Sequence, residues 1–185
     1  MIIRAATAAD TDALAAIYGH HVRHGFGTFE EDPPAPAEME IRRAAIADRG
    51  LPYLVAEAPD DQGGRILGFA YAAPFRPRQA YRYTLEDSVY IAPDAIGKGV
   101  GRAVLSAVIS ACEAMGIRQL VAVIGDSGNA ASIGLHRSLG FVDAGVGRSF
   151  GFKHGRWVDI VWMQKSLNGG DQTDPDTAGV ELSSS

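Results

Sequence analysis

The sequence has a single cysteine, no apolar run long enough to cross a membrane and no excess of basic residues. One cysteine excludes an internal disulfide, and the place of Cys112 on the apolar side of a predicted helix indicates a core residue. No membrane span and no secretory leader is apparent, so a cytoplasmic protein is expected. The 17 basic residues are outnumbered by 22 acidic ones, so neither nucleic acid nor an anionic membrane is an expected partner.

The size and composition of the chain favour one globular domain. Its 185 residues, 46% of them hydrophobic, suffice for one substantial core, and the domain is predicted to span residues 1–166. From residue 167 onward the chain is mainly Gly, Asp, Thr and Ser, with few large apolar side chains. Burial of so few apolar groups does not offset the entropy of ordering, so residues 167–185 are predicted to be a disordered tail.

Hydrophobic periodicity predicts the secondary structure. Helices are predicted at 8–24, 37–48 and 102–115, with another starting at Asn129. Strands are predicted at 2–5, 51–58, 66–73, 84–91, 120–124, 142–150 and 157–164. The order strand, helix, strand across 84–124 indicates a right-handed crossover between parallel strands. The predicted fold class is α/β (α+β), a single domain with a mixed, mostly antiparallel, twisted sheet of about seven strands and helices on both faces.

A glycine-rich run, IGKGVGR at 96–102, joins the strand at 84–91 to the following helix. Glycines there let main-chain N–H groups and the positive end of the helix dipole face an anion, which predicts a phosphate site. A dinucleotide-binding fold would need glycine where Arg102 stands, and a nucleotide-triphosphate loop would need Ser or Thr directly after Lys98, where Gly99 stands. A flexible turn without a ligand is the alternative.

The same run resembles the pyrophosphate loop Q/R-x-x-G-x-G/A of the GNAT superfamily of N-acetyltransferases. Gly99 and Gly101 occupy its glycine positions, while Ile96 replaces the usual Gln or Arg. Residues 129–141 resemble a later motif of that family, an Asn-started helix that precedes x-x-x-G-F. Residues 81–91 and 155–164 are similar to two strands of one branch, the phosphinothricin and methionine sulfone acetyltransferases. The chain is therefore identified as a member of this superfamily and branch.

The resemblance implies that acetyl-CoA is the cosubstrate. No metal is expected, because His20 and His24 have a spacing that can hold zinc but no third ligand is evident. A main-chain N–H near Tyr90 or Ile91 is expected to polarise the thioester carbonyl. Asn129 resembles the residue that binds the pantetheine arm, although its place also suits a helix N-cap, and one side chain could do either. The residues predicted to bind the coenzyme are Val89, Tyr90, Ile91, Gly97, Lys98, Gly99, Val100, Gly101, Arg102, Asn129 and Ser132.

Glu86 is the first catalytic candidate. Acetyl transfer to an amine needs a deprotonated amine and a protonated leaving thiolate. Side chains alternate along a strand, so Glu86, Ser88 and Tyr90 should share one face of the strand at 84–91, opposite Asp87, Val89 and Ile91. A carboxylate can serve as base through a water or with a pKa raised by burial. The alternative is a carboxylate that only orders a cation such as Arg82.

His136 is the second catalytic candidate, because an imidazole can give or take a proton near neutral pH. In the resembling family most members have Tyr at this position, near the coenzyme sulfur. His136 is therefore expected to protonate the leaving thiolate or to act as a base through water. A packing role is the alternative.

Residues for the acceptor come from two loops and a strand. Arg76 and Arg78 lie on a proline-stiffened loop, and guanidinium groups suit capture of a carboxylate or phosphinate. Simple solvation is the alternative, but the resembling branch has basic residues that face an amino-acid substrate here. The residues predicted to complete an apolar pocket lined with hydroxyl groups are Thr28, Phe29, Tyr83 and Thr84.

The function expected from this resemblance is transfer of an acetyl group from acetyl-CoA to the α-amine of a small amino acid analogue. Phosphinothricin, methionine sulfoximine and methionine sulfone are examples of that class. A different amine, such as a protein N-terminus, a polyamine or an aminoglycoside, is the nearest alternative, and a non-catalytic acetyl-CoA sensor is another. The branch also implies a homodimer.

Overall fold

A computed structural model of the chain describes residues 1–59 and 64–182. The secondary structure of these residues comprises strands β1 (Ile2–Ala5), β2 (Tyr53–Glu57), β3 (Ile66–Pro74), β4 (Thr84–Ile91), β5 (Gln119–Gly125), β6 (Val142–Lys153) and β7 (Arg156–Ser166), and helices α1 (Thr11–His24), α2 (Pro36–Ala47), α3 (Val100–Ala114) and α4 (Ala130–Ser138). Short 3₁₀ turns lie at η1 (Ala8–Asp10), η3 (Gln79–Tyr81) and η4 (Pro93–Ala95). The predicted helices and strands are all present, with small shifts at their ends.

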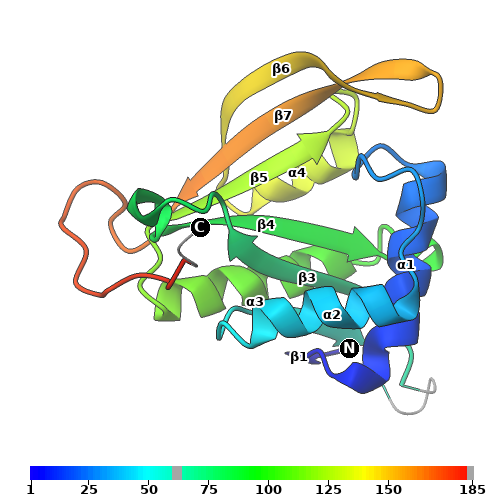
Figure 1. Ribbon diagram of the computed structural model, residues 1–185, viewed down its shortest axis with the longest axis horizontal. Helices are drawn as coiled ribbons and strands as arrows, with labels where there is room; N and C mark the ends of the chain where they lie inside the picture. The colour runs from blue at the N-terminus through cyan, green and yellow to red at the C-terminus, as the bar shows by residue number, and fades with distance from the viewer. Residues whose placement is uncertain (60–63, 183–185) are drawn as a thin grey trace.

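The strands form one sheet in the order β1-β2-β3-β4-β5-β7-β6. Strands β4 and β5 run parallel, and each other neighbouring pair is antiparallel. Helices α1 and α2 cover one face of the sheet, and α3 and α4 cover the other (Figure 1). The predicted fold class, a mixed and mostly antiparallel sheet with helices on both faces, is confirmed. No helix in 1–59 or 64–182 has both the length and the apolar character needed to cross a membrane.

The main core lies between α3 and the sheet. Helix α3 turns Val104, Val108 and Cys112 inward at helical spacing, and all three are fully buried. They face sheet residues such as Leu85 and Leu120, which are also fully buried. This packing fixes α3, and with it the glycine-rich run before the helix, against the centre of the sheet.

The neighbouring strands β4 and β5 separate part-way along their length. Their parallel pairing extends from Thr84 opposite Gln119 to Asp87 opposite Ala122. Beyond that point β4 stays paired to β3 as far as Ile91, and β5 stays paired to β7 as far as Gly125. The two strands therefore diverge and leave an opening whose edges are main-chain groups without a partner strand.

The C-terminal segment differs from the predicted disordered tail. Its described part packs on the domain, with Val180 and Leu182 buried. The guanidinium group of Arg118, itself buried, donates hydrogen bonds to the carbonyl oxygens of Gly170 and Thr173. A buried guanidinium needs acceptors, and this segment supplies them, a requirement that the composition of the segment alone does not reveal. Residues 183–185, also predicted to be disordered, lie outside the described part.

Candidate active site

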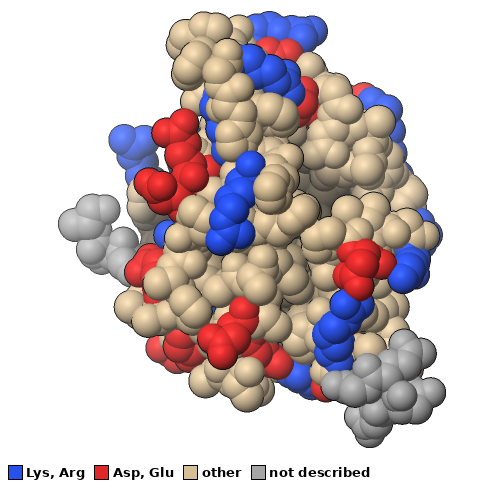
Figure 2. Space-filling view, turned by 90° about the vertical axis from the view of Figure 1, so that its right-hand side faces the viewer, with Lys and Arg blue, Asp and Glu red and all other residues tan. Residues whose placement is uncertain are grey.

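A groove of about 450 Å³ lies beside the opening between β4 and β5, at the N-terminal ends of α3 and α4. Seen from this side (Figure 2), the surface has a largely uncharged hollow, with basic and acidic side chains interspersed around it. Most residues predicted to bind the coenzyme line this groove: Val89, Ile91, Gly97, Gly99, Val100, Gly101, Arg102, Asn129 and Ser132. Lys98 and Tyr90 do not, because Lys98 is exposed on the loop and the ring of Tyr90 packs against Tyr18 of α1.

The glycine-rich loop has the backbone geometry of an anion site. Gly97 and Gly99 have φ angles of 78° and 79°, in the left-handed region that glycine adopts without strain. Gly99 is the residue that caps the N-terminus of α3. The first N–H groups of a helix have no intrahelical acceptor, so those of Val100 and Gly101 can receive a phosphate that enters the groove.

Asn129 caps α4 and also lines the groove. Its Oδ1 accepts a hydrogen bond from the N–H of Ser132 at 3.2 Å, which caps the N-terminus of α4. The same side chain lines the groove, next to Ser132. The cap therefore holds the first turn of α4 in place at the wall of the groove.

The direction of the main chain in β4 decides which N–H groups face the opening. The N–H of Ala92 donates to Leu67 on the β3 side at 2.9 Å. Because alternate residues of a strand point their N–H groups to opposite sides, the N–H of Tyr90 also faces β3, while Val89 and Ile91 face the opening. The prediction of a main-chain donor near Tyr90 or Ile91 thus narrows to Val89 and Ile91.

A second cavity, of about 250 Å³, lies on the opposite face of β4. Its lining combines the α1–α2 loop with four strands: Gly27, Thr28, Phe29, Tyr71, Glu86, Ser88, Tyr90, Val123, Gly125 and Ile160. The predicted alternation along β4 is confirmed, since Glu86, Ser88 and Tyr90 reach this cavity while Val89 and Ile91 reach the groove. The strand thus separates the two spaces.

Glu86 has the electrostatic character expected of a base. Burial raises the pKa of its carboxyl group, the positive charge of Arg76 opposes this shift, and the negative charge of Asp87 adds to it. The net direction is upward, which makes the carboxylate a better proton acceptor. Arg82 lies over the ring of Tyr83 at 4.7 Å and donates to Gln79, so no ion pair between it and Glu86 supports the alternative role.

The wall formed by the α1–α2 loop depends on two glycines. A Cβ on Gly125 of β5 would lie 1.8 Å from the carbonyl oxygen of Phe26, and one on Gly151 of β6 would lie 2.4 Å from the ring of Phe29. The absence of both side chains lets the loop sit directly on the sheet. The ammonium group of Lys153, a buried side chain of β6, donates to the Thr28 carbonyl at 2.8 Å and secures the loop from the other side.

Of the residues predicted to bind the acceptor, Phe29 lines this cavity and the two arginines do not. Arg76 donates to the Phe75 carbonyl and lies 4.5 Å above the Phe75 ring, at a separate cavity of about 400 Å³ shared with Leu182. Arg78 is exposed and lines none of the cavities described. The charge of Arg76 nevertheless lowers the pKa of Glu86, which lines the second cavity.

Tyr83 and Thr84 also lie outside the second cavity. The hydroxyl group of Tyr83 donates to the Thr177 carbonyl at 2.7 Å, and Thr84 lines a different cavity together with Trp162. The C-terminal segment is the reason for the first difference, because it lies against Tyr83 and gives its hydroxyl group an acceptor. Of the predicted hydroxyl groups, that of Thr28 lines the cavity, and Tyr71 and Ser88 supply the others.

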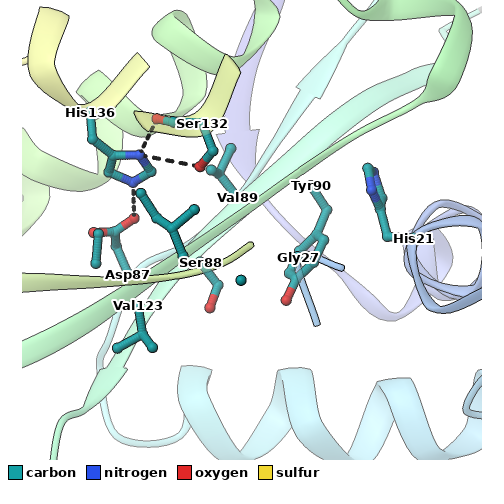
Figure 3. A pocket seen from close by; sticks show the side chains of 12 residues that line it. His21, Gly27, Asp87, Ser88, Val89, Tyr90, Val123, Ser132 and His136 are labelled. Carbon is teal, nitrogen blue, oxygen red and sulfur yellow. Dashed lines mark hydrogen bonds and ion pairs between the residues drawn. The ribbon is translucent and has the colours of Figure 1, made fainter. Parts of the chain in front are cut away.

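His136 lies at a third cavity, of about 70 Å³, between β4, β5 and α4 (Figure 3). Its Nε2 is 3.0 Å from Oδ2 of Asp87, and its Nδ1 donates to the Ser132 carbonyl at 2.7 Å. Burial lowers the pKa of His136, but the hydrogen bond and charge of Asp87 outweigh it and the net direction is upward. Both ring nitrogens have protein partners, so direct proton donation by His136 would require one of these bonds to break.

Two side chains at the site were not singled out by sequence reasoning. His21 of α1 lines both the groove and the third cavity, and its Nε2 donates to the Ile91 carbonyl at 2.9 Å. Burial lowers its pKa, which favours the neutral ring. Asp87, the partner of His136, could have been suspected as a carboxylate on the buried face of β4. The contacts of His21 carry no sequence signal, since they join α1 to a strand seventy residues later.

The remaining residues give no sign of a metal centre. Across the ranges 1–59 and 64–182, no three His, Cys, Asp or Glu side chains are grouped so that they could hold a metal ion. The site is therefore described by its groove, its two smaller cavities and the strand β4 that separates them.

This combination of a split sheet, a glycine loop at a helix start and a carboxylate across the strand defines a class of acetyl-transferring proteins, and sequence comparison agrees. Residues 16–141 match the model of the acetyltransferase (GNAT) family. The chain belongs to the GNAT family of acetyltransferases.

Relatives within that family indicate which branch of it the chain resembles. The chain is 59% identical to a phosphinothricin N-acetyltransferase of Alcaligenes faecalis over 90% of this chain and 83% of the relative. It is 42% identical to an L-methionine sulfoximine/L-methionine sulfone acetyltransferase of Pseudomonas paraeruginosa over 90% of this chain and 94% of the relative. A crystal structure of a phosphinothricin acetyltransferase from Sinorhizobium meliloti in complex with AcCoA has a TM-score of 0.90 and 46% identity, covering 97% of this chain and 94% of that one. The predicted branch is thereby confirmed.

Proposed function

We propose that the protein transfers the acetyl group of acetyl-CoA to the α-amine of a small amino acid analogue of the phosphinothricin, methionine sulfoximine or methionine sulfone type. The observation that carries this proposal is the position of β4 between two spaces. One face of the strand lines the groove at the start of α3, and the other presents Glu86 to a cavity of about 250 Å³. A coenzyme and an amine can therefore meet across the opening between β4 and β5.

The residues present suit acetyl-CoA. The N–H groups at the start of α3 would hold the pyrophosphate, and Asn129 and Ser132 would contact the pantetheine arm. When bound, the coenzyme supplies an acetyl thioester. The N–H of Val89 or Ile91 would stabilise negative charge that develops on the thioester oxygen.

Proton transfer falls to Glu86. The acceptor amine must lose a proton before its nitrogen can form a bond to the acetyl carbon, as the carbon–sulfur bond breaks. Glu86, with its raised pKa, would take that proton directly or through a water. The departing thiolate needs one proton in return, and His136 is the predicted source.

The proposed class of acceptor rests on the names of the relatives and on the positive charge of Arg76. The names of the two curated relatives specify phosphinothricin and methionine derivatives as acceptors of those proteins. Arg76 is close enough to influence Glu86, and it would favour an anionic acceptor over a polyamine or an aminoglycoside. Capture of the acceptor's carboxylate or phosphinate by Arg76 and Arg78 would require both side chains to turn from their present positions toward the cavity.

The test is release of free coenzyme A thiol from acetyl-CoA in the presence of different amines. Methionine sulfone, methionine sulfoximine and phosphinothricin should give turnover, while spermidine, an aminoglycoside and a peptide should not. Turnover with only the second group would overturn the acceptor class. Binding of acetyl-CoA with no turnover for any of the six would favour the sensor alternative.

We also propose that the protein is a homodimer, joined through the hairpin of β6 and β7. Phe150, Phe152 and Trp157 are more than half exposed there, which is an unusual concentration of apolar surface for one hairpin. Light scattering should report the mass of two chains. Trp157→Glu should shift the protein toward the mass of one chain, and a single-chain mass for the unaltered protein would refute the dimer.

A cytoplasmic location stays a prediction.

A further inference from the structure

Three side chains form a chain of contacts from a buried carboxylate to the coenzyme groove. Oδ2 of Asp87 is 3.0 Å from Nε2 of His136, and these two side chains are 1% and 2% exposed. On the other side of the ring, Nδ1 lies 2.7 Å from the carbonyl oxygen and 3.5 Å from the hydroxyl group of Ser132. Figure 3 shows the imidazole ring held between Asp87 and Ser132.

The partners of the ring decide where its protons are. A carbonyl oxygen only accepts, so Nδ1 carries a hydrogen. When the imidazole is protonated, the form that the raised pKa of His136 favours, Nε2 also carries a hydrogen and donates it to Asp87. The ring then holds a proton that can leave through Nδ1 toward Ser132.

Ser132 connects this pair to the coenzyme. It lines both the third cavity, with His136 and Asp87, and the groove, with Gly99 and Asn129. The cap formed by Asn129 fixes the main chain of Ser132, so the hydroxyl group has a defined position at the wall. Ser132 is therefore the member of the chain of contacts that a bound coenzyme can reach, whereas His136 is 2% exposed.

Within the described residues, no polar contact other than the one with His136 explains why the carboxylate of Asp87 is buried. Its Oδ1 is buried and has no hydrogen-bond partner within 1–59 or 64–182. Leaving such an oxygen unpaired opposes folding, and a residue used only for packing would not need it. The sole polar partner of the Asp87 side chain in those ranges is His136.

We propose that Asp87, His136 and Ser132 form a proton relay in which the hydroxyl group of Ser132 protonates the thiolate of coenzyme A as it leaves. The proton of Oγ passes to the sulfur, the Nδ1 proton of His136 leaves its hydrogen bond to the Ser132 carbonyl and passes to Oγ, and the proton between Nε2 and Asp87 remains on the ring. Solvent then restores the lost proton. Ser132 is the catalytic residue of this step, and Asp87 is a positioning residue that acts through His136. The relay rests on the proposed function.

The surroundings of the relay define its pH dependence. Besides Asp87, the titratable groups near His136 are His21 of α1 across the cavity and Cys112 of α3, which is close enough for Asp87 to act on it. Glu86 is on the other face of β4 and is also influenced by Asp87. Burial, followed by the charge of Asp87, raises the pKa of the Cys112 thiol to about 12, so it stays uncharged.

Ser132→Ala tests the donor. Removal of the hydroxyl group should lower kcat by about 10²-fold, a typical contribution of general acid catalysis, and should change the dissociation constant for coenzyme A far less. Ser132→Thr retains a hydroxyl group and should retain most of the activity. Ser110→Ala, an exposed serine of α3, is the matched control. An unchanged kcat for Ser132→Ala would overturn the relay.

Asp87→Asn tests the positioning residue with a readout that packing alone does not move. Loss of the carboxylate charge should lower the pKa of His136, so the alkaline limb of the kcat profile should move to lower pH. Titration of the His136 ring followed by NMR should show the same shift. If both measurements are unchanged in a variant that still binds coenzyme A, Asp87 has no such role. Turnover by the unaltered protein with these null results refutes the relay alone, while no turnover by that protein refutes the proposed function.

Discussion

The two faces of β4 are built in different ways. The groove face uses main-chain N–H groups of a contiguous loop and helix start, with Gly97 and Gly99 in left-handed conformations. The acceptor face uses side chains from the α1–α2 loop, β3, β4, β5 and β7. A binding site for a common phosphate group needs only backbone geometry, whereas selection among amines needs side chains assembled from distant segments.

That difference predicts how substitutions should act. Changes on the acceptor face should affect catalysis and acceptor binding and leave coenzyme binding unchanged, whereas changes in the glycine-rich loop of the groove face should weaken coenzyme binding and leave acceptor binding unchanged. The strand itself connects the two, because Glu86 and Asp87 point to opposite faces and the charge of Asp87 still raises the pKa of Glu86. Substitutions on each side of β4 test whether the two faces act separately.

Glu86→Gln should lower kcat by about 10²-fold or more, because a general base is lost while the shape of the side chain is kept. The pKa of Glu86 is raised, so activity of the unaltered protein should fall as the pH drops through that raised value, above the usual carboxyl range near 4.3. Gln cannot be protonated, so this acidic limb should disappear. A pH series of kcat/KM is the measurement.

Two checks accompany that result. Coenzyme A binding by Glu86→Gln, measured by calorimetry, should be unchanged if the two faces are separate. Asp143→Asn, on the exposed part of β6 and paired there with Arg137, is the control for loss of a carboxylate. Equal loss of activity and of coenzyme affinity in Glu86→Gln would contradict the division between faces.

Gly99→Ala should weaken coenzyme A binding with little effect on the KM of the acceptor. The added Cβ meets no atom within 4 Å, so the effect comes from the φ of 79° alone. A left-handed conformation costs a residue with a side chain about 1–2 kcal/mol, which corresponds to roughly tenfold in the dissociation constant if binding requires it. Gly134→Ala on α4, where Cβ also meets open space but the backbone is helical, should bind normally.

The same contrast explains how far the sequence predicts this protein. Glycine spacing and hydrophobic periodicity depend on local geometry, so the fold and most of the groove could be predicted. The acceptor residues depend on which segments meet, and Tyr71 and Gly125 come from strands with no motif of their own. Arg118 is an example of a contact that the sequence alone does not predict. Its buried charge requires partners from residues 170 and 173, and composition alone assigns that segment to a disordered tail.

Deletion of residues 168–185 tests whether this segment stabilises the domain, as its contacts with Arg118 indicate, or is a disordered tail, as its composition predicts. The deletion removes the carbonyl acceptors of Arg118, so the free energy of unfolding should drop by about 1–3 kcal/mol. Each kcal/mol lowers Tm by about 2–4 °C for a domain of this size. Differential scanning calorimetry provides the measurement, with deletion of 183–185 alone as control. An unchanged Tm for the longer deletion would restore the prediction of a disordered tail.

The smallest effect is expected for Tyr83→Phe. The sequence places this hydroxyl group in the acceptor pocket, where its loss should raise the KM of methionine sulfone. In the structure the hydroxyl group instead donates to Thr177 and does not reach the cavity that contains Glu86. The KM should therefore stay unchanged, while Phe29→Ala, which removes a wall of that cavity, should raise it. A higher KM for Tyr83→Phe would mean that the acceptor face extends to the loop held by the C-terminal segment, and the boundary drawn at β4 would have to move.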